Sequence, residues 1–138
     1  MEIRSRRSVA EDQDATTRPD TKGTHVWWLL SKKTAGASAI VLNIGDLPPR
    51  TAHQLHRHPH AEQAVLVLAG RGLHLRHDGP PAEVEPGDAI FVPAGEWHGF
   101  ANPFEQTVTI ASIYGGVGDR SEAGYELHSG PPFDFAAS

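Results

Sequence analysis

Short runs of β-branched, leucine and aromatic residues, separated by glycine and proline, fill the middle of the chain. Runs of about four to eight such residues, bounded by turn-forming residues, predict β-strands. No segment of the sequence carries a sustained helical stripe. The predicted strands cover residues 25–30, 38–44, 63–68, 73–76, 89–92, 97–101 and 107–114.

Turn signals separate these strands about every eight to twelve residues, a spacing typical of sandwiches and barrels of antiparallel strands. Segment 45–50, with the sequence GDLPPR, predicts a turn because its two prolines cannot donate hydrogen bonds to a strand ladder. Segments 78–81 (DGPP) and 85–88 (EPGD) predict two more turns. The composition agrees, since 14 glycines and 11 prolines favour many short strands over helices.

The two ends of the chain lack this pattern. Residues 1–22 contain few large apolar side chains and are predicted to form a disordered N-terminal arm. The arm also lacks the apolar middle of a signal peptide, so we expect a cytoplasmic protein. Residues 116–138 are rich in glycine, proline and serine and predict a C-terminal covering tail, in which 121–125 could form one helical turn. Between them, residues 23–115 are predicted to form one domain.

Charge and cysteine content argue against several classes of protein. The 12 basic residues against 17 acidic residues give a net charge of −5, which argues against a general nucleic-acid binder. The absence of cysteine excludes disulfides, thiolate metal sites and cysteine nucleophiles. No apolar run approaches the ~20 residues of a membrane span, so no membrane partner is expected. Histidine, in contrast, is concentrated, since six of the nine lie between positions 53 and 77.

Two segments carry residues suited to metal binding. The first contains His56 and His58, and residues two apart on a strand point the same way about 6.7 Å from each other. Two imidazoles at that spacing can converge on one ion. Pro59 then ends the strand, and the chain returns from Gln63. In the second segment, residues 87–102, a strand, a Pro/Gly turn and another strand deliver His98.

Together the two segments resemble the paired motifs of the cupin superfamily over about residues 24–114. The first motif matches at His56, His58 and Gly70, but its leading glycine is replaced by Arg50. A full match to the second motif is expected by chance in only about 10⁻⁴ of sequences of this length and composition. The second motif is matched in full by Gly87, Pro93, Gly95, His98 and Asn102.

The first motif leaves its third ligand position open between two neighbours. Glu62 keeps a three-residue gap after His58, whereas Gln63 keeps a four-residue gap and the six-residue spacing to Gly70. Both faces of this strand are apolar, so periodicity does not decide. Because the turn at Gly70 sets the register of the strand, we favour Gln63. The resemblance then implies a metal ligand set of His56, His58, Gln63 and His98.

The resemblance implies an all-β, single-domain jelly-roll barrel, the double-stranded β-helix, with one divalent transition metal inside. The candidate metals are Fe, Mn, Ni and Zn, with Fe(II) slightly favoured, because neutral ligands do not compensate the higher charge of ferric iron. The implied function is a metal-dependent enzyme for a small polar organic substrate that chelates the metal, and an oxygenase or dioxygenase comes first. The alternatives are a non-redox isomerase, lyase or uronate-converting enzyme, and a non-catalytic cupin that binds a small ligand.

Further residues are assigned from their positions. Glu62 is the only carboxylate of the first motif and Tyr114 ends the last strand, so both are candidate catalytic residues. His53 lies three residues before His56 and is therefore expected to face the opposite side of its strand. We interpret His60 as a turn residue, and His74 and His77 as ordinary strand residues. The candidate substrate-pocket residues are Phe91, Phe100 and Trp28.

A homodimer is also predicted. If Gln63 faces inward, then Ala64, Leu66 and Leu68 face outward and form an apolar surface that one barrel cannot cover. The strand at 25–30 could pair across such an interface.

Overall fold

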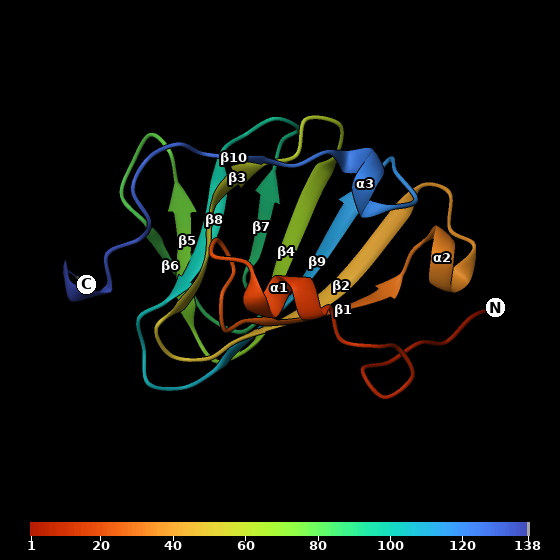
Figure 1. Cartoon of the computed structure of the whole chain (residues 1–138), viewed down its shortest axis with the longest axis horizontal. Helices are drawn as coiled ribbons and strands as arrows, with labels where there is room; N and C mark the ends of the chain where they lie inside the picture. The colour runs from red at the N-terminus through yellow and green to blue at the C-terminus, as the bar shows by residue number, and fades with distance from the viewer. Residues whose placement is uncertain (138) are drawn as a thin grey trace.

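The computed structural model describes residues 1–137 and consists mainly of antiparallel β-strands (Figure 1). The elements are α1 (Gln13–Thr17), β1 (His25–Leu30), α2 (Lys32–Ala35), β2 (Ile40–Leu47), β3 (Thr51–Arg57), β4 (Glu62–Ala69), β5 (Gly72–Arg76), β6 (Ala82–Val84), β7 (Ala89–Val92), β8 (His98–Asn102), β9 (Val108–Gly115), α3 (Arg120–Ala123), β10 (Glu126–Leu127) and the 3₁₀ helix η1 (Phe135–Ala137). One sheet has the order β1-β2-β9-β4-β7 and the other β10-β3-β8-β5-β6. This arrangement confirms the predicted all-β jelly-roll fold.

Strand β4 shows which of its two apolar faces the fold buries. Its odd-numbered residues Gln63, Val65 and Val67 are buried, and the even-numbered residues are exposed. Outward-facing Leu66 and Leu68 are 39% and 45% exposed, as the choice of Gln63 requires. The homodimer stays a prediction.

The core between the sheets consists of Leu47, Val65, Val67, Val84, Phe100, Val108 and Ile110.

The turn predicted at 45–50 is shorter than expected. Strand β2 continues through this segment because Asp46 pairs with Thr109 and Leu47 pairs with Val108 on β9. The chain turns only at 48–50, where Arg50 has a φ of 62°. Short elements such as α2 and β6 were not predicted, because three or four residues are too few to show a period.

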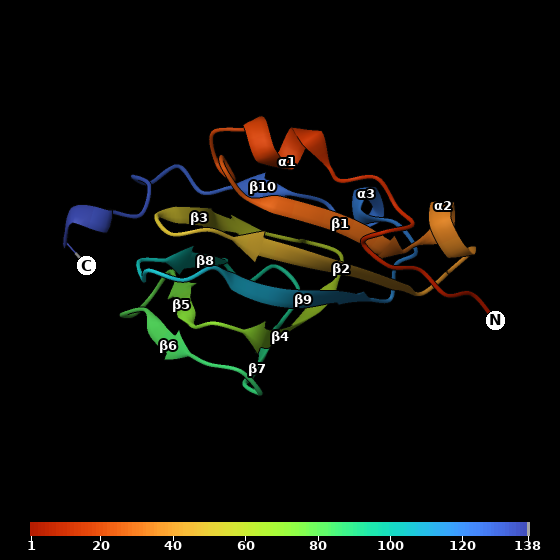
Figure 2. The ribbon, with the colours of Figure 1, turned by 90° about the horizontal axis from the view of Figure 1, so that it is seen from below.

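The N-terminal segment differs from the disordered arm that its composition predicts. Its helix α1 is capped by the Asp12 carboxylate, which accepts hydrogen bonds from the first backbone N–H groups of the helix. The same carboxylate accepts hydrogen bonds from the Trp28 indole and from Arg120. As a result, α1 lies outside β1 and β10 (Figure 2). Polar contacts to distant residues order this segment, and such contacts leave no hydrophobic period in the sequence.

The C-terminal segment contains the single helical turn that was expected near 121–125, as α3. Beyond it, Phe133 and Phe135 pack against the outer side of the second sheet, over Ala52, Leu75 and Ala101. Among residues 1–137 there is no helix with the length and apolar character needed to cross a membrane.

A bulge in β3 controls which of its side chains face inward. His53 pairs with Phe100 and His56 pairs with His98 on β8, so β3 contains one residue more than its partner between these pairs. Residues three apart on a regular strand point to opposite faces, but the extra residue of the bulge reverses this, so His53 and His56 share one face. The backbone at the bulge lies close to Gly99, where an added Cβ would come within 2.6 Å of the His53 carbonyl oxygen.

We therefore expect Gly99→Ala to destabilise the protein by about 1–3 kcal/mol, because the methyl group must push the bulge away from β8. Gly79→Ala is the matched control, since nothing lies within 4 Å of a Cβ at Gly79. The control should change the free energy of unfolding by less than about 0.5 kcal/mol. Urea unfolding of both variants measures the difference, and equal stabilities would contradict the close approach at Gly99.

Candidate metal centre

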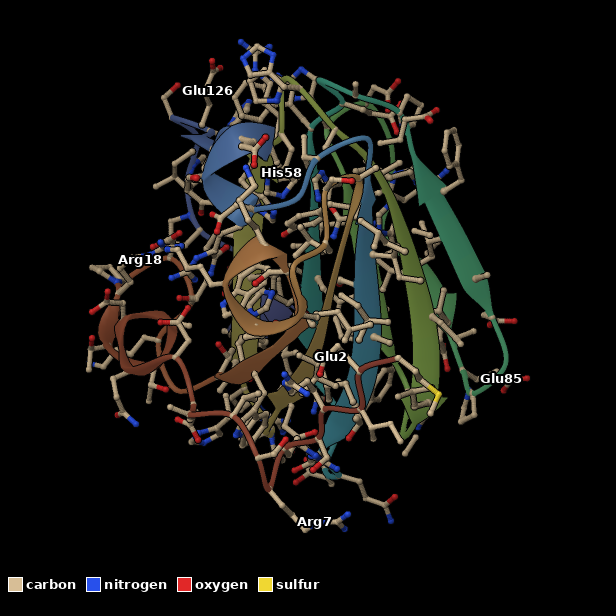
Figure 3. The ribbon with its side chains drawn as sticks, turned by 90° about the vertical axis from the view of Figure 1, so that its right-hand side faces the viewer. Glu2, Arg7, Arg18, His58, Glu85 and Glu126 are labelled. Atoms are coloured by element: carbon tan, nitrogen blue, oxygen red, sulfur yellow. The ribbon has the colours of Figure 1, made fainter. Side chains whose placement is uncertain are left out.

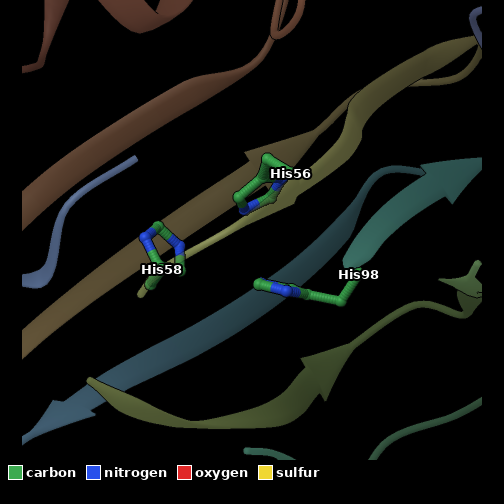
Figure 4. Close-up of side chains that lie close together, drawn as sticks. All are labelled: His56, His58 and His98. Carbon is green, nitrogen blue, oxygen red and sulfur yellow. The ribbon is translucent and has the colours of Figure 1, made fainter. Parts of the chain in front are cut away.

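Three histidines from two neighbouring strands meet between the sheets. His56 lies near the end of β3, His58 directly follows that strand, and His98 begins β8. One ring nitrogen from each lies within 4.8 Å of the others. The three rings face one another (Figure 4), and each residue is less than 10% exposed. The sequence prediction that these imidazoles converge is consistent with this geometry.

Backbone carbonyls orient all three rings. The Nδ1 atom of His56 lies 2.6 Å from the Gln54 oxygen, and Nδ1 of His98 lies 3.0 Å from the Glu96 oxygen. Nδ1 of His58 lies 2.8 Å from the oxygen of Gly124, in the loop after α3; Figure 3 shows His58 beside this helix. A carbonyl can only accept, so each Nδ1 carries the hydrogen and each Nε2 keeps a lone pair.

Two of these lone pairs and one amide oxygen have no hydrogen-bond partner among residues 1–137. Nε2 of His58 and of His98, and Oε1 of Gln63, are buried without a hydrogen bond. Each such atom costs about 1–3 kcal/mol when it is buried unsatisfied. A divalent cation coordinated by imidazole nitrogens and an amide oxygen would satisfy all of them. His56, His58, His98 and Gln63 therefore fit a transition metal, and they are the residues that would hold it.

Of the two alternatives for the fourth position, only Gln63 faces the histidines. It pairs with Val92 and Tyr114 across the sheet and is 6% exposed. Glu62 points to the exposed outer face and does not line the cavity. The structure thus does not place Glu62 where a catalytic carboxylate would act.

Burial keeps the three imidazoles neutral. Desolvation is the main cause that lowers the pKa of His98 to about 4 and that lowers the pKa of His56 and of His58. For His56, the two other histidines lower the pKa further, because a proton on one ring repels a proton on the next. Neutral rings at pH 7 present lone pairs to a metal without first losing a proton.

The three histidines open into a cavity of about 360 Å³. Two of the three predicted pocket residues, Phe100 and Trp28, line it. Phe91 does not, because β7 turns its side chain to the outer face, where it is 63% exposed. Tyr114 also lines the cavity, with its ring centroid 4.7 Å from that of His58. Burial raises the pKa of Tyr114, so its hydroxyl stays protonated.

Several cavity residues were missed by sequence reasoning. Tyr125 stacks on His56 with ring centroids 5.1 Å apart, and its hydroxyl donates to Asp20. Asp20 also accepts two hydrogen bonds from Arg18, at 3.1 and 3.0 Å. These residues come from the two segments predicted to be an arm and a tail, and nothing in their spacing indicated a site. His74 lies on β5, as predicted, and its place in the cavity lining is a further finding.

His53 corrects another prediction. It lines the same cavity as His56 and does not face the opposite side of β3. Counting residues along a regular strand gives the wrong face here, because the bulge adds a residue between the two histidines.

Comparisons with known proteins identify the family. Residues 43–114, just over half of the chain, match the Cupin domain, and the chain belongs to this family. The polyketide cyclase RemF from Streptomyces resistomycificus is 31% identical, with a TM-score of 0.72, over 83% of this chain and 79% of that one. Protein SchB from Streptomyces halstedii is 26% identical over 104 residues, which is 75% of each chain.

More distant structures share the fold alone. The dimethylsulfoniopropionate lyase DddQ from Ruegeria pomeroyi is 19% identical, with a TM-score of 0.69, over 86% of this chain and 60% of that one. A predicted oxalate decarboxylase from Thermotoga maritima is 20% identical, with a TM-score of 0.72, over 84% of this chain and all of that one.

Replacing His56 or His98 by alanine should reduce the affinity for Zn²⁺ by more than about 100-fold, since even residues behind a ligand contribute about 10–100-fold. Glu62→Ala is the matched control and should bind Zn²⁺ like the unmodified protein, because its side chain is outside the cavity. Calorimetric titration of metal-free protein measures these affinities. Full zinc affinity in either histidine variant would rule out the proposed ligand set.

Metal-free protein should lose stability as the pH falls from 6.5 to 4. Burial lowers the pKa of His53 and of His98 from 6.5 to about 4, so in this window the unfolded chain binds protons that the folded protein does not. The loss is at most about 3 kcal/mol for each imidazole. Urea unfolding at several pH values measures it, and a free energy of unfolding that stays constant across this window would be the contrary result.

Proposed function

We propose that this protein is a metal-dependent enzyme that cyclises linear β-polyketones by intramolecular aldol condensation. The observation that carries the proposal is the donor set, in which three imidazoles and one amide are all neutral and open into the cavity. Such donors leave the full double charge on a divalent ion, which favours binding of anionic or enolised oxygens. The 31% identity to the polyketide cyclase RemF supports the same substrate class.

The bound cation would act as a Lewis acid that polarises a carbonyl and acidifies the neighbouring C–H bonds. The chain supplies the surroundings. The rings of Trp28 and Tyr114, with centroids 5.9 Å apart, and that of Phe100 give the cavity apolar walls that keep water away from a folded substrate. The protonated hydroxyl of Tyr114 can donate a hydrogen bond to a substrate oxygen.

The proposed reaction balances without an oxidant. A carbon next to one carbonyl loses a proton and forms a C–C bond to a second carbonyl carbon, whose C=O electron pair moves to oxygen. That oxygen takes up the proton, and the resulting hydroxyl later leaves as water together with a hydrogen from a neighbouring ring carbon. Enolisation of the two remaining ketones then gives the aromatic ring. Water is the only by-product.

The oxygenase predicted from the sequence stays a prediction, as does Fe(II). An oxygenase differs from a cyclase in one measurable way, because an oxygenase must consume dioxygen as its substrate disappears. A binding function without catalysis differs from both, because the ligand would be recovered unchanged.

Heptane-2,4,6-trione tests the proposal, because its cyclisation and loss of water give orcinol. Zinc-loaded protein should form orcinol faster than the uncatalysed reaction, and His98→Ala should lower the rate to that of the control without enzyme. Glu62→Ala is the matched variant and should keep the activity. Chromatography with mass detection follows the product while an oxygen electrode records the gas. Recovery of unchanged trione, or loss of dioxygen in proportion to substrate, would refute the cyclase.

A further inference from the structure

His53 faces the cavity but is not one of the metal ligands. Because of the bulge in β3 it points to the same face as His56, and it pairs with Phe100 on β8. His56 pairs with His98, two residues along β8 from Phe100. Two residues on a strand span about 6.7 Å, so His53 lies one cross-strand row away from the metal ligands.

A buried hydroxyl determines which nitrogen of His53 carries the hydrogen and which keeps a lone pair. Nε2 of His53 lies 3.2 Å from Oγ1 of Thr24, a residue with no solvent exposure. The single hydrogen of this hydroxyl is already donated to the carbonyl oxygen of Thr21, at 2.7 Å. The hydroxyl must therefore accept from Nε2–H, and Nδ1 of His53 keeps a lone pair. Among residues 1–137, no protein group donates a hydrogen bond to this Nδ1.

We propose that His53 is a substrate-binding residue whose Nδ1 accepts a hydrogen bond from an enol hydroxyl of the polyketone, beyond the two oxygens held at the metal ligands. The assignment rests on the proposed function, and it specifies a substrate with at least three oxygens on alternating carbons of one chain. In such a chain every second carbon carries an oxygen. With two neighbouring oxygens at the metal ligands, a substrate aligned with β8 would bring its third oxygen toward the row of His53 and Phe100.

The charges around His53 agree with an acceptor role. Burial lowers its pKa to about 4, so the ring is neutral at pH 7. Asp20 raises and Arg18 lowers this pKa, and the two are paired with each other. A neutral ring with its Nε2–H already engaged offers only an acceptor to the cavity. It therefore distinguishes an enol, which can donate, from a ketone, which cannot.

Two probes measure the contribution of the third oxygen. Calorimetric titration of zinc-loaded protein with heptane-2,4,6-trione and with pentane-2,4-dione gives the preference for three oxygens over two. We expect His53→Leu to lower this preference roughly tenfold while the affinities for zinc and for the dione stay unchanged. His77→Leu is the matched control, because His77 is exposed and does not line the cavity. The control should keep the preference of the unmodified protein.

Nitrogen NMR of the unmodified, zinc-loaded protein provides a second measurement that does not depend on a variant folding. The His53 ring should carry its hydrogen on Nε2, and the trione, but not the dione, should shift the Nδ1 resonance toward a hydrogen-bonded position. An unchanged preference in His53→Leu, a hydrogen on Nδ1, or no binding of the trione would each overturn the assignment. If the trione binds with the expected preference but is not cyclised, the role of His53 stands and only the cyclase proposal fails. If orcinol forms at the same rate in the unmodified protein and in His53→Leu, and the variant keeps the preference for the trione, the cyclase proposal stands and only the role of His53 fails.

Discussion

Each of three buried imidazoles donates its Nδ1 hydrogen to a backbone carbonyl, and this directs three Nε2 lone pairs to one point between the sheets. Much of the local architecture serves these contacts. The carbonyls of Gln54 and Glu96 are fixed by the bulge in β3 and by the turn before β8, and Gly99 leaves room for the bulge to lie close. A cation at this point resolves the cost of burying unpartnered acceptors.

The walls of the cavity come from both ends of the chain. Asp12 ties α1 to Trp28 and Arg120, and Asp20 ties the same N-terminal segment to Tyr125. His58 is oriented by Gly124, which lies between these two contacts in the C-terminal segment. The candidate ligands and the cavity walls are therefore linked, because the C-terminal segment both orients His58 and bonds to the N-terminal segment. Ion pairs that are partly buried hold this arrangement more firmly than exposed pairs would.

The fold itself hosts many reactions, and only the site distinguishes them. In this chain the distinguishing features are the neutral fourth donor Gln63 and the uncoordinated His53. The first would set the charge that a bound metal retains, and the second is the acceptor that we propose for a further substrate oxygen. In the proposed function both features act on a substrate rich in enolisable oxygens, and neither requires a redox step.

The sequence by itself determined the strand framework and the candidate metal-ligating residues. The local signals are the spacing of His56 and His58, the spacing of Gln63 to Gly70, and the glycine and proline positions around His98. Such signals can be read from the linear chain. The tertiary structure alone decided that His53 faces the cavity, that Phe91 does not, and that residues 11–22 form a wall. The bulge is defined only by pairing with β8, and the position of Phe91 by the pairing of β7 with β4. The wall is defined by an ion pair and a hydrogen bond between residues about a hundred positions apart. Hydrophobic periodicity records which face of an element is buried, but it does not record strand irregularities or polar contacts between distant segments.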